Sequence, residues 1–91
     1  MAEITRSVTV TGRVQGVGYR AWTTETARGL GLSGWVRNEA DGSVRAVISG
    51  HRDAVAKMLE AMEEGPRWAR VATVRAEASD SPDQIGFDVL A

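Results

Sequence analysis

A glycine-rich turn at residues 12–20 joins two segments of different periodicity and limits how the chain can fold. In residues 4–14 most even positions are apolar, while threonines and a serine occupy the odd positions, a pattern typical of a half-buried strand. Residues 19–30 place apolar side chains at helical spacing, and Gly31 can end that helix in a left-handed conformation. The chain must therefore pass from a strand into a helix within this turn.

Three glycines and one arginine make the turn suited to binding an anion. Gly12, Gly16 and Gly18 permit positive φ angles and a close approach of a ligand to the main chain. The N–H groups of such a turn can converge as a nest, to which the helix adds its positive end. Arg20 offers a planar fork that matches two phosphate oxygens. The turn therefore predicts an anion cradle.

The positive charge of this region is local. Residues 4–24 contain three arginines and no Asp or Glu, whereas the whole chain has 11 basic and 12 acidic residues and a net charge of −1. The glycines could instead form only a tight connection, with Arg20 as a solvated residue. However, a positive charge in the first turn of a helix opposes the helix dipole unless an anion is present. The pattern favours anion binding over a plain connector.

Composition excludes several classes of protein. A chain of 91 residues is expected to form a single domain, residues 1–91. A net charge of −1 argues against a general nucleic-acid or membrane-surface binder. The chain has no cysteine and one histidine, so we expect no disulfide, no thiolate chemistry and no metal site. We find no targeting segment or membrane-spanning run and expect a cytoplasmic protein.

The middle of the chain predicts two strands joined by a tight turn. Residues 33–38 have strand character, and the dipeptide Asp41-Gly42 is a strong hairpin signal. Residues 43–49 then alternate apolar and polar side chains. We expect Gly50 to break this second strand.

The last part of the chain predicts a helix and two strands. His51 belongs to the cap region of this helix, whose apolar residues recur at i, i+3, i+4 and i+7 across residues 55–62. Gly65 with the following proline ends it. Residues 69–77 are expected to form a strand, and residues 87–89 a short closing strand. The tryptophans are expected in or beside the core: Trp22, Trp35 and Trp68.

This order of elements defines the fold class. Each helical stripe and each apolar strand face needs a partner, so two helices must cover one face of an antiparallel sheet. The expectation is an α+β protein, a ferredoxin-like βαββαβ sandwich with a short extra C-terminal strand. In that arrangement the loop after the first strand lies beside the end of the second strand. Asn38 is therefore expected near Arg20.

A dinucleotide site is the main rival interpretation of the glycine turn. Residues 16–21 match the G-x-G-x-x-A fingerprint, and Glu39 lies at the required distance along the chain. A doubly wound domain, however, needs its second strand to lead into another helix, whereas Asp41-Gly42 predicts a hairpin. A chain of 91 residues is also too short for six strands with their helices. We therefore disfavour this interpretation.

Two motifs resemble those of a known family. The run GRVQGVGYR at residues 12–20, followed by GWVRN at 34–38 and DGSV at 41–44, is similar to the acylphosphatases, and the resemblance extends over essentially the whole chain. It implies a ferredoxin-like enzyme that hydrolyses acyl phosphates to a carboxylate and inorganic phosphate, without a metal or cofactor. By this resemblance Arg20 binds the phosphate and Asn38 positions the attacking water. The implied phosphate cradle consists of Gln15, Gly16, Val17, Gly18 and Tyr19.

The chemistry of an acyl phosphate agrees with such a sparse site. Its leaving group is a carboxylate, whose conjugate acid has a pKa of about 4 like a Glu or Asp side chain, so it departs without a general acid. Phosphoryl transfer through a loose transition state needs charge stabilisation and a positioned nucleophile. We expect loop N–H groups and Arg20 to provide the first, and the Asn38 amide to provide the second. A phosphate oxygen of the substrate is expected to take the proton of the water.

Two functions of other classes are weighed against this one. A phosphate-binding or acyl-phosphate-binding module would use the same cradle without turnover, but Asn38 beside Arg20 argues against it. RNA binding on the open face of the sheet is a third possibility. The open face of the first strand carries only threonines and a serine and no stacking aromatic residue. We therefore expect a small acyl phosphate as substrate, no nucleic-acid or membrane partner, and a monomer.

Overall fold

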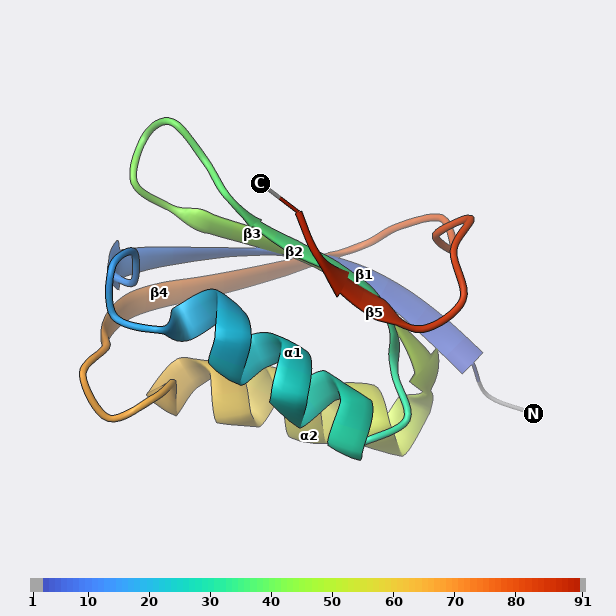
Figure 1. Cartoon of the computed structure of the whole chain (residues 1–91). Helices are drawn as coiled ribbons and strands as arrows, with labels where there is room; N and C mark the ends of the chain where they lie inside the picture. Colours follow the sequence, from blue (N-terminus) through green and yellow to red (C-terminus); the bar gives the residue numbers. More distant parts are fainter. Residues whose placement is uncertain (1–2, 91) are drawn as a thin grey trace.

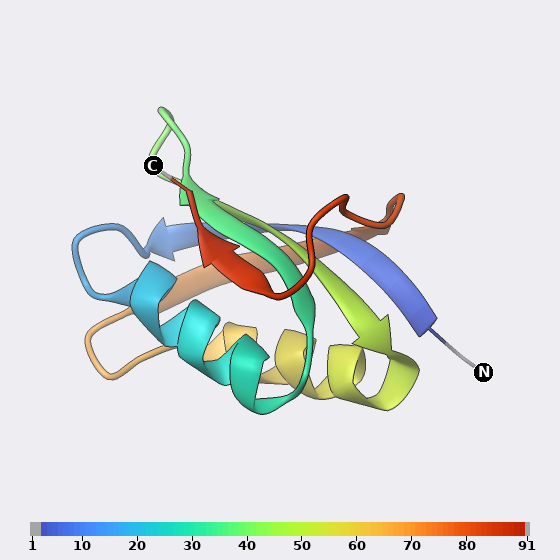
Figure 2. The same cartoon turned by 45° about the vertical axis from the view of Figure 1, so that its right-hand side comes forward.

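The strands and helices follow the order that the periodicities predict. The computed structural model describes residues 3–90, in which one five-stranded sheet is covered on one face by two helices (Figures 1 and 2). Along the chain, the elements are β1 (Glu3–Arg13), α1 (Tyr19–Gly29), β2 (Ser33–Asn38), β3 (Val44–His51), α2 (Arg52–Glu64), β4 (Arg70–Ala78) and β5 (Phe87–Val89). The predicted ferredoxin-like sandwich is confirmed, and each predicted strand and helix is present.

The sheet has the strand order β4-β1-β3-β2-β5. Its first four strands pair antiparallel, as expected, whereas β5 pairs parallel with β2. The sheet is therefore mixed, and the expectation of a purely antiparallel sheet is wrong at this edge. The direction of β5 follows from the topology: β4 runs antiparallel to β2, so a chain that turns back after β4 runs parallel to β2. Figure 1 shows the connection that carries the chain from one edge of the sheet to the other.

The prediction that Gly50 breaks the third strand is also wrong. β3 continues through His51, and Gly50 pairs with Ile4 of β1. A Cβ atom at Gly50 would lie 2.7 Å from a methyl group of Leu32, so the absence of a side chain lets the two segments approach. Helix α2 begins at the next residue after the strand, and the Nδ1 atom of His51 accepts a hydrogen bond from the N–H of Asp53 at 3.1 Å. The cap role expected for His51 is confirmed.

A Schellman motif ends helix α1 as expected. Gly31 has a φ of 71°, its N–H donates to the carbonyl of Arg28, and the N–H of Leu32 donates to the carbonyl of Ala27. The chain is thereby turned directly into β2. Because β2 starts directly after this turn and ends at Asn38, the turn at the end of α1 sets how far β2 runs back toward the start of the helix.

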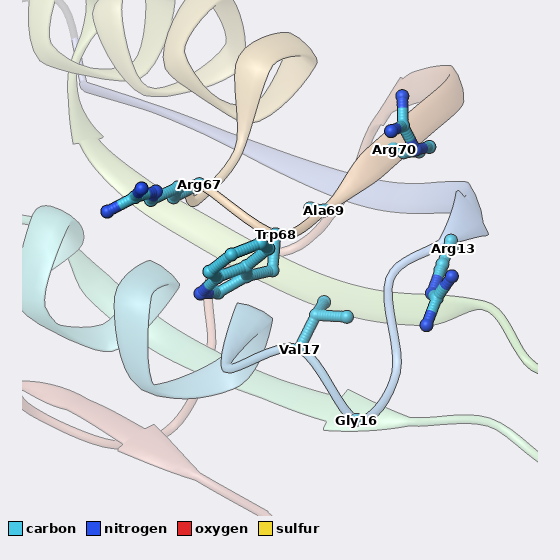
Figure 3. Close-up of a pocket in the computed structure, with 7 residues that line it drawn as sticks. All are labelled: Arg13, Gly16, Val17, Arg67, Trp68, Ala69 and Arg70. Atoms are coloured by element: carbon cyan, nitrogen blue, oxygen red, sulfur yellow. The ribbon is translucent and has the colours of Figure 1, made fainter.

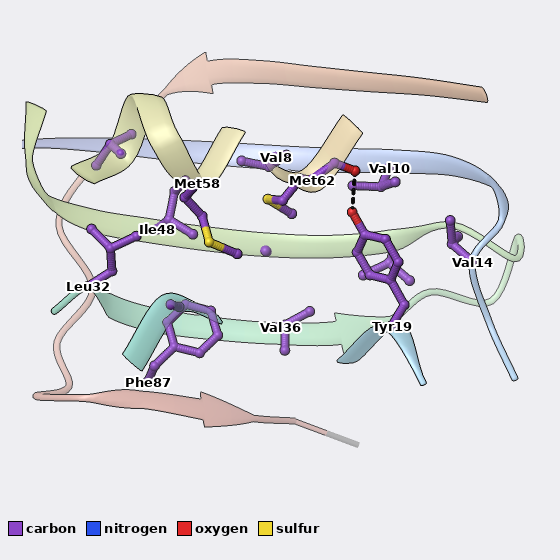
Figure 4. Packing of buried hydrophobic residues seen from close by; sticks show 14 residues of the cluster. Val8, Val10, Val14, Tyr19, Leu32, Val36, Ile48, Met58, Met62 and Phe87 are labelled. Atoms are coloured by element: carbon purple, nitrogen blue, oxygen red, sulfur yellow. Dashed lines mark hydrogen bonds between the residues drawn. The ribbon is translucent and has the colours of Figure 1, made fainter. Parts of the chain in front are cut away.

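Buried apolar side chains from the sheet and both helices form one core (Figure 4). In α1, the polar residues Thr23 and Thr24 are buried, while Trp22 is partly buried and packs against the core. Tyr19 lies fully within this core, and its hydroxyl donates a 2.7 Å hydrogen bond to the carbonyl of Met62. This bond ties the first turn of α1 to the end of α2.

Replacing Tyr19 with Phe tests this tie. The carbonyl of Met62 would lose its buried donor, so we expect the free energy of unfolding to fall by about 1–2 kcal/mol. Burial also raises the pKa of the Tyr19 phenol well above its ordinary value. The folded state therefore holds this proton after the unfolded state has released it, so stability falls as the pH rises above about 10. Urea unfolding at pH 7 should show that the Tyr19→Phe variant is the less stable protein, and equal stability at that pH would contradict the tie. At pH 10.5 the difference should be smaller, because only the unchanged protein loses stability with rising pH.

Candidate active site

The loop between β1 and α1 leaves the start of the helix open. Gly16 and Gly18 have φ angles of 75° and 82°, which side chains rarely adopt. Gly18 is the N-cap of α1, so no side chain caps the helix, and its first turn contains no acidic residue. The unpaired N–H groups and the positive end of the helix dipole are thus presented together at this loop. An anion is the natural ligand of such a helix start.

Gly12 has a different role from the other two glycines of the turn. It lies within β1, where the pairing with β4 shifts by one residue. An added Cβ would be 2.3 Å from the carbonyl oxygen of Arg70, so a side chain would collide with the neighbouring strand. Its place in the anion cradle, suggested by the glycine spacing, is therefore not supported. Gly12 serves the close pairing of β1 with β4.

Gln15 ties the loop to the hairpin that follows β2. Its Nε2 donates to the carbonyl of Glu39 at 2.8 Å and to that of Ser43 at 2.9 Å. Asp41 closes the same hairpin by accepting from the N–H and hydroxyl of Ser43, and these bonds hold the pKa of Asp41 below its ordinary value. The side chain of Gln15 is therefore occupied in positioning the loop. Since the side-chain amide N–H groups are used in these two bonds, the main-chain N–H is the donor that Gln15 can offer to an anion.

Arg20 and Asn38 line one pocket of about 280 Å³, as the predicted fold requires. We call it the reaction pocket. Main chain and small side chains form most of its wall, and the complete lining is Val14, Gly16, Gly18, Tyr19, Arg20, Ala21, Asn38 and Val89. It has no His, Asp or Glu in its lining. The pocket thus brings the open loop, a guanidinium and an amide to one place.

The guanidinium of Arg20 is held only loosely by the protein. Its Nη1 donates to the carbonyl of Leu90 at 3.4 Å, a long hydrogen bond. Within residues 3–90 no carboxylate lies within 4.0 Å of it. Because no internal ion pair occupies it within residues 3–90, the guanidinium is available to a bound anion.

Asn38 has a buried polar atom with no hydrogen-bond partner in the described part of the chain. This atom is its side-chain Oδ1. A buried acceptor without a partner costs about 1–3 kcal/mol, so such groups are rare in folded proteins. Asn38 also lies in the wall of the reaction pocket, so its side-chain amide is available there to a ligand or a water molecule.

The predicted site residues divide into two groups. The reaction pocket is lined by Gly16, Gly18, Tyr19, Arg20 and Asn38, although the Tyr19 side chain is buried in the core. Gln15 and Val17 do not line it, and Val17 lines a second pocket instead. Sequence reasoning missed Val89, which lines the reaction pocket, and Leu90, whose carbonyl accepts the hydrogen bond from Arg20. No local signal marks them, because their position depends on a strand pairing distant in sequence.

The dinucleotide interpretation can be compared with this geometry. β2 leads into a hairpin and pairs antiparallel with β3, so the dinucleotide-binding topology is excluded. Within residues 3–90, no three His, Cys, Asp or Glu side chains gather in a way that could hold a metal ion. No helix in this range is long and apolar enough to cross a membrane.

Comparisons with known proteins agree with one another. The family model for acylphosphatase matches residues 6–89. An acylphosphatase of Rhodopseudomonas palustris is 53% identical over 87 residues, which is 96% of this chain and 87% of that protein. The structure of an acylphosphatase from Coxiella burnetii is similar with a TM-score of 0.93 at 38% identity and covers 98% of this chain and 94% of its own. That from Bacillus subtilis has a TM-score of 0.92 at 30% identity, with 97% and 99% covered.

Proposed function

The chain belongs to the acylphosphatase family, and on this premise we propose how its residues hydrolyse an acyl phosphate to a carboxylate and inorganic phosphate. The N–H groups of residues 15–19 and the guanidinium of Arg20 bind the phosphoryl group. Asn38 positions the water that attacks phosphorus. One observation carries the proposal: Arg20 and the partnerless amide of Asn38 line the same pocket as the open start of α1.

The phosphoryl group needs donors around its equatorial oxygens as the bond to the leaving group lengthens. The loop supplies main-chain donors that are already in place, and Arg20 supplies a planar pair of N–H groups. Because the loop is fixed by Gln15 to the hairpin and by Tyr19 to the core, these donors need little reorganisation during the reaction. The carboxylate leaving group requires no proton.

Asn38 positions the attacking water in this proposal. Its amide both accepts and donates hydrogen bonds, so it can hold a water molecule in one orientation. When that water is held in line with the leaving oxygen, the attack on phosphorus no longer depends on a chance encounter, which lowers the entropic part of the barrier. Since the lining of the reaction pocket contains no His, Asp or Glu, we propose that a substrate phosphate oxygen accepts the proton of the water. The reaction as proposed uses no metal or cofactor.

Exchanging Arg20 for Lys separates charge from geometry. A lysine keeps the positive charge but cannot place two parallel N–H groups on two oxygens. We expect kcat/KM for benzoyl phosphate to fall more than tenfold, equivalent to about 1.4 kcal/mol. The rate is followed optically, with the melting temperature as a check on folding. A variant with nearly full efficiency would show that the fork geometry does not matter.

Partners and location belong to the same proposal: a cytoplasmic monomer, one domain over residues 1–91, with no nucleic-acid or membrane partner.

An aromatic residue does lie on the open face of the sheet, since Trp35 alternates with the buried Val36. However, the guanidinium of Arg37 stacks 4.8 Å from the centre of that ring and is held by Glu39 at 2.6 Å. The ring face is therefore occupied. Filter binding with single-stranded RNA and light scattering would test both parts, and RNA retention or a dimer mass would contradict them.

A further inference from the structure

A second pocket of about 630 Å³ lies between the cradle loop and the segment that joins α2 to β4 (Figure 3). Arg13, Arg67 and Arg70 line it together with Trp68, and Gly16 and Val17 contribute the wall on the side of the loop. We call it the arginine pocket. Its three arginines and Trp68 are not among the site residues that the sequence predicts, whereas Gly16 and Val17 are.

The arginine pocket is positively charged and lacks an internal counter-ion. No Asp or Glu lines it, and none of its three guanidinium groups forms a hydrogen bond or ion pair with another side chain of residues 3–90. Arg13 and Arg70 are also directly opposite each other in the β1–β4 ladder. Like charges at such positions destabilise a sheet, unless an anion lies near both. The pocket is therefore suited to an anionic group.

Trp68 gives the pocket an aromatic wall. The prediction that places it in or beside the core is wrong, since the side chain is 69% exposed. The guanidinium of Arg67 lies 5.0 Å from the centre of its ring, so cation and ring form one surface. Figure 3 shows the ring of Trp68 across from Val17, with the Arg67 side chain extending away from Val17. An apolar or planar group with a negative charge at its end would find both partners here.

Gly16 connects the arginine pocket to the reaction pocket, because it lines both. An added Cβ at Gly16 would meet no atom within 4 Å, so the space beside it is open. Asn38 lines only the reaction pocket. In an in-line displacement, the acyl group leaves on the side of phosphorus opposite the attacking water. Asn38, which is proposed to hold that water, does not line the arginine pocket. The acyl group would therefore extend into the arginine pocket.

We propose that the arginine pocket binds the acyl group of the substrate and selects acyl groups that carry a negative charge, such as a carboxylate or a second phosphate. This inference rests on the proposed function, since it assumes that the phosphoryl group occupies the reaction pocket. The reaction itself is unchanged. Arg13, Arg67 and Arg70 are then specificity-determining residues.

Two substrates of equal shape test the selection. 4-Carboxybenzoyl phosphate carries a negative charge at the far end of its ring, and 4-carbamoylbenzoyl phosphate is its neutral counterpart. We expect kcat/KM at low salt to be about tenfold higher for the charged substrate, equivalent to about 1.4 kcal/mol. In the double variant Arg67→Gln/Arg70→Gln, which leaves only Arg13, this ratio should fall toward one. High salt should reduce the ratio of the unchanged protein, because these guanidinium groups are exposed to solvent.

The control is Arg75→Gln, which removes one positive charge from the same strand, β4, at a position that lines neither pocket. It should keep the ratio of the unchanged protein. Equal kcat/KM values for the two substrates in the unchanged protein would overturn the inference, as would a preference that survives undiminished in the double variant. Failure of the proposed function gives a different result, because Arg20→Lys would then leave the hydrolysis of both substrates intact.

Discussion

Replacing Arg20 with Ala is expected to lower kcat/KM for benzoyl phosphate by about a thousandfold, or ~4 kcal/mol. The guanidinium lies in the reaction pocket without a carboxylate partner among residues 3–90, so its charge is available to the phosphoryl oxygens. Alanine removes both its charge and its fork. The loop N–H groups remain, so hydrolysis should persist at a low level. Steady-state rates would measure the loss.

The matched control for this change is Arg75→Ala. Arg75 is an exposed arginine on β4, outside both pockets, and its removal should leave kcat/KM within about twofold, since surface changes of this kind have small effects. Circular dichroism and the melting temperature would show that both variants fold. Unchanged turnover in a folded Arg20→Ala protein would remove this residue from the mechanism.

Replacing Asn38 with Ala is expected to reduce kcat about a hundredfold, or ~2.7 kcal/mol, because the attacking water loses its fixed position. KM should change little, since the phosphate donors remain in place. Stability should change by less than about 1 kcal/mol, because the Oδ1 atom of Asn38 has no hydrogen-bond partner within residues 3–90 that alanine would remove.

Rates and urea unfolding of the same Asn38→Ala sample would test both expectations together. A loss of activity without a loss of stability is the signature of a residue kept for function. A protein that is destabilised by more than 1 kcal/mol and fully active would show the reverse, namely that Asn38 is a structural residue.

The sequence predicts the main parts of the fold because they depend on local patterns. The change from strand to helical periodicity, the glycine cap at Gly31 and the turn at Asp41-Gly42 each act over a few residues. Together they bring the cradle loop and Asn38 to one pocket. The error at Gly50 has a simple cause: glycine usually weakens a strand, but here it makes room for Leu32.

Other parts of the site depend on contacts between distant segments. Val89 reaches the reaction pocket, and the carbonyl of Leu90 reaches Arg20, only through the pairing of β5 with β2, which three residues of strand cannot specify. The arginine pocket likewise combines Arg13 with residues more than fifty positions later. Trp68 is apolar and is therefore expected in or beside the core, but it lies in the segment before β4, where its side chain is exposed. Such features require the assembled structure.

Hydrolysis of benzoyl phosphate in water enriched in ¹⁸O tests the central claim most directly. The account assigns the phosphoryl group to the loop and Arg20, and the attacking water to Asn38, so the new bond forms at phosphorus. Mass spectrometry after enzymatic turnover should therefore find the heavy oxygen in inorganic phosphate and none in benzoate. Label in benzoate would mean attack at the carbonyl carbon and would contradict the account.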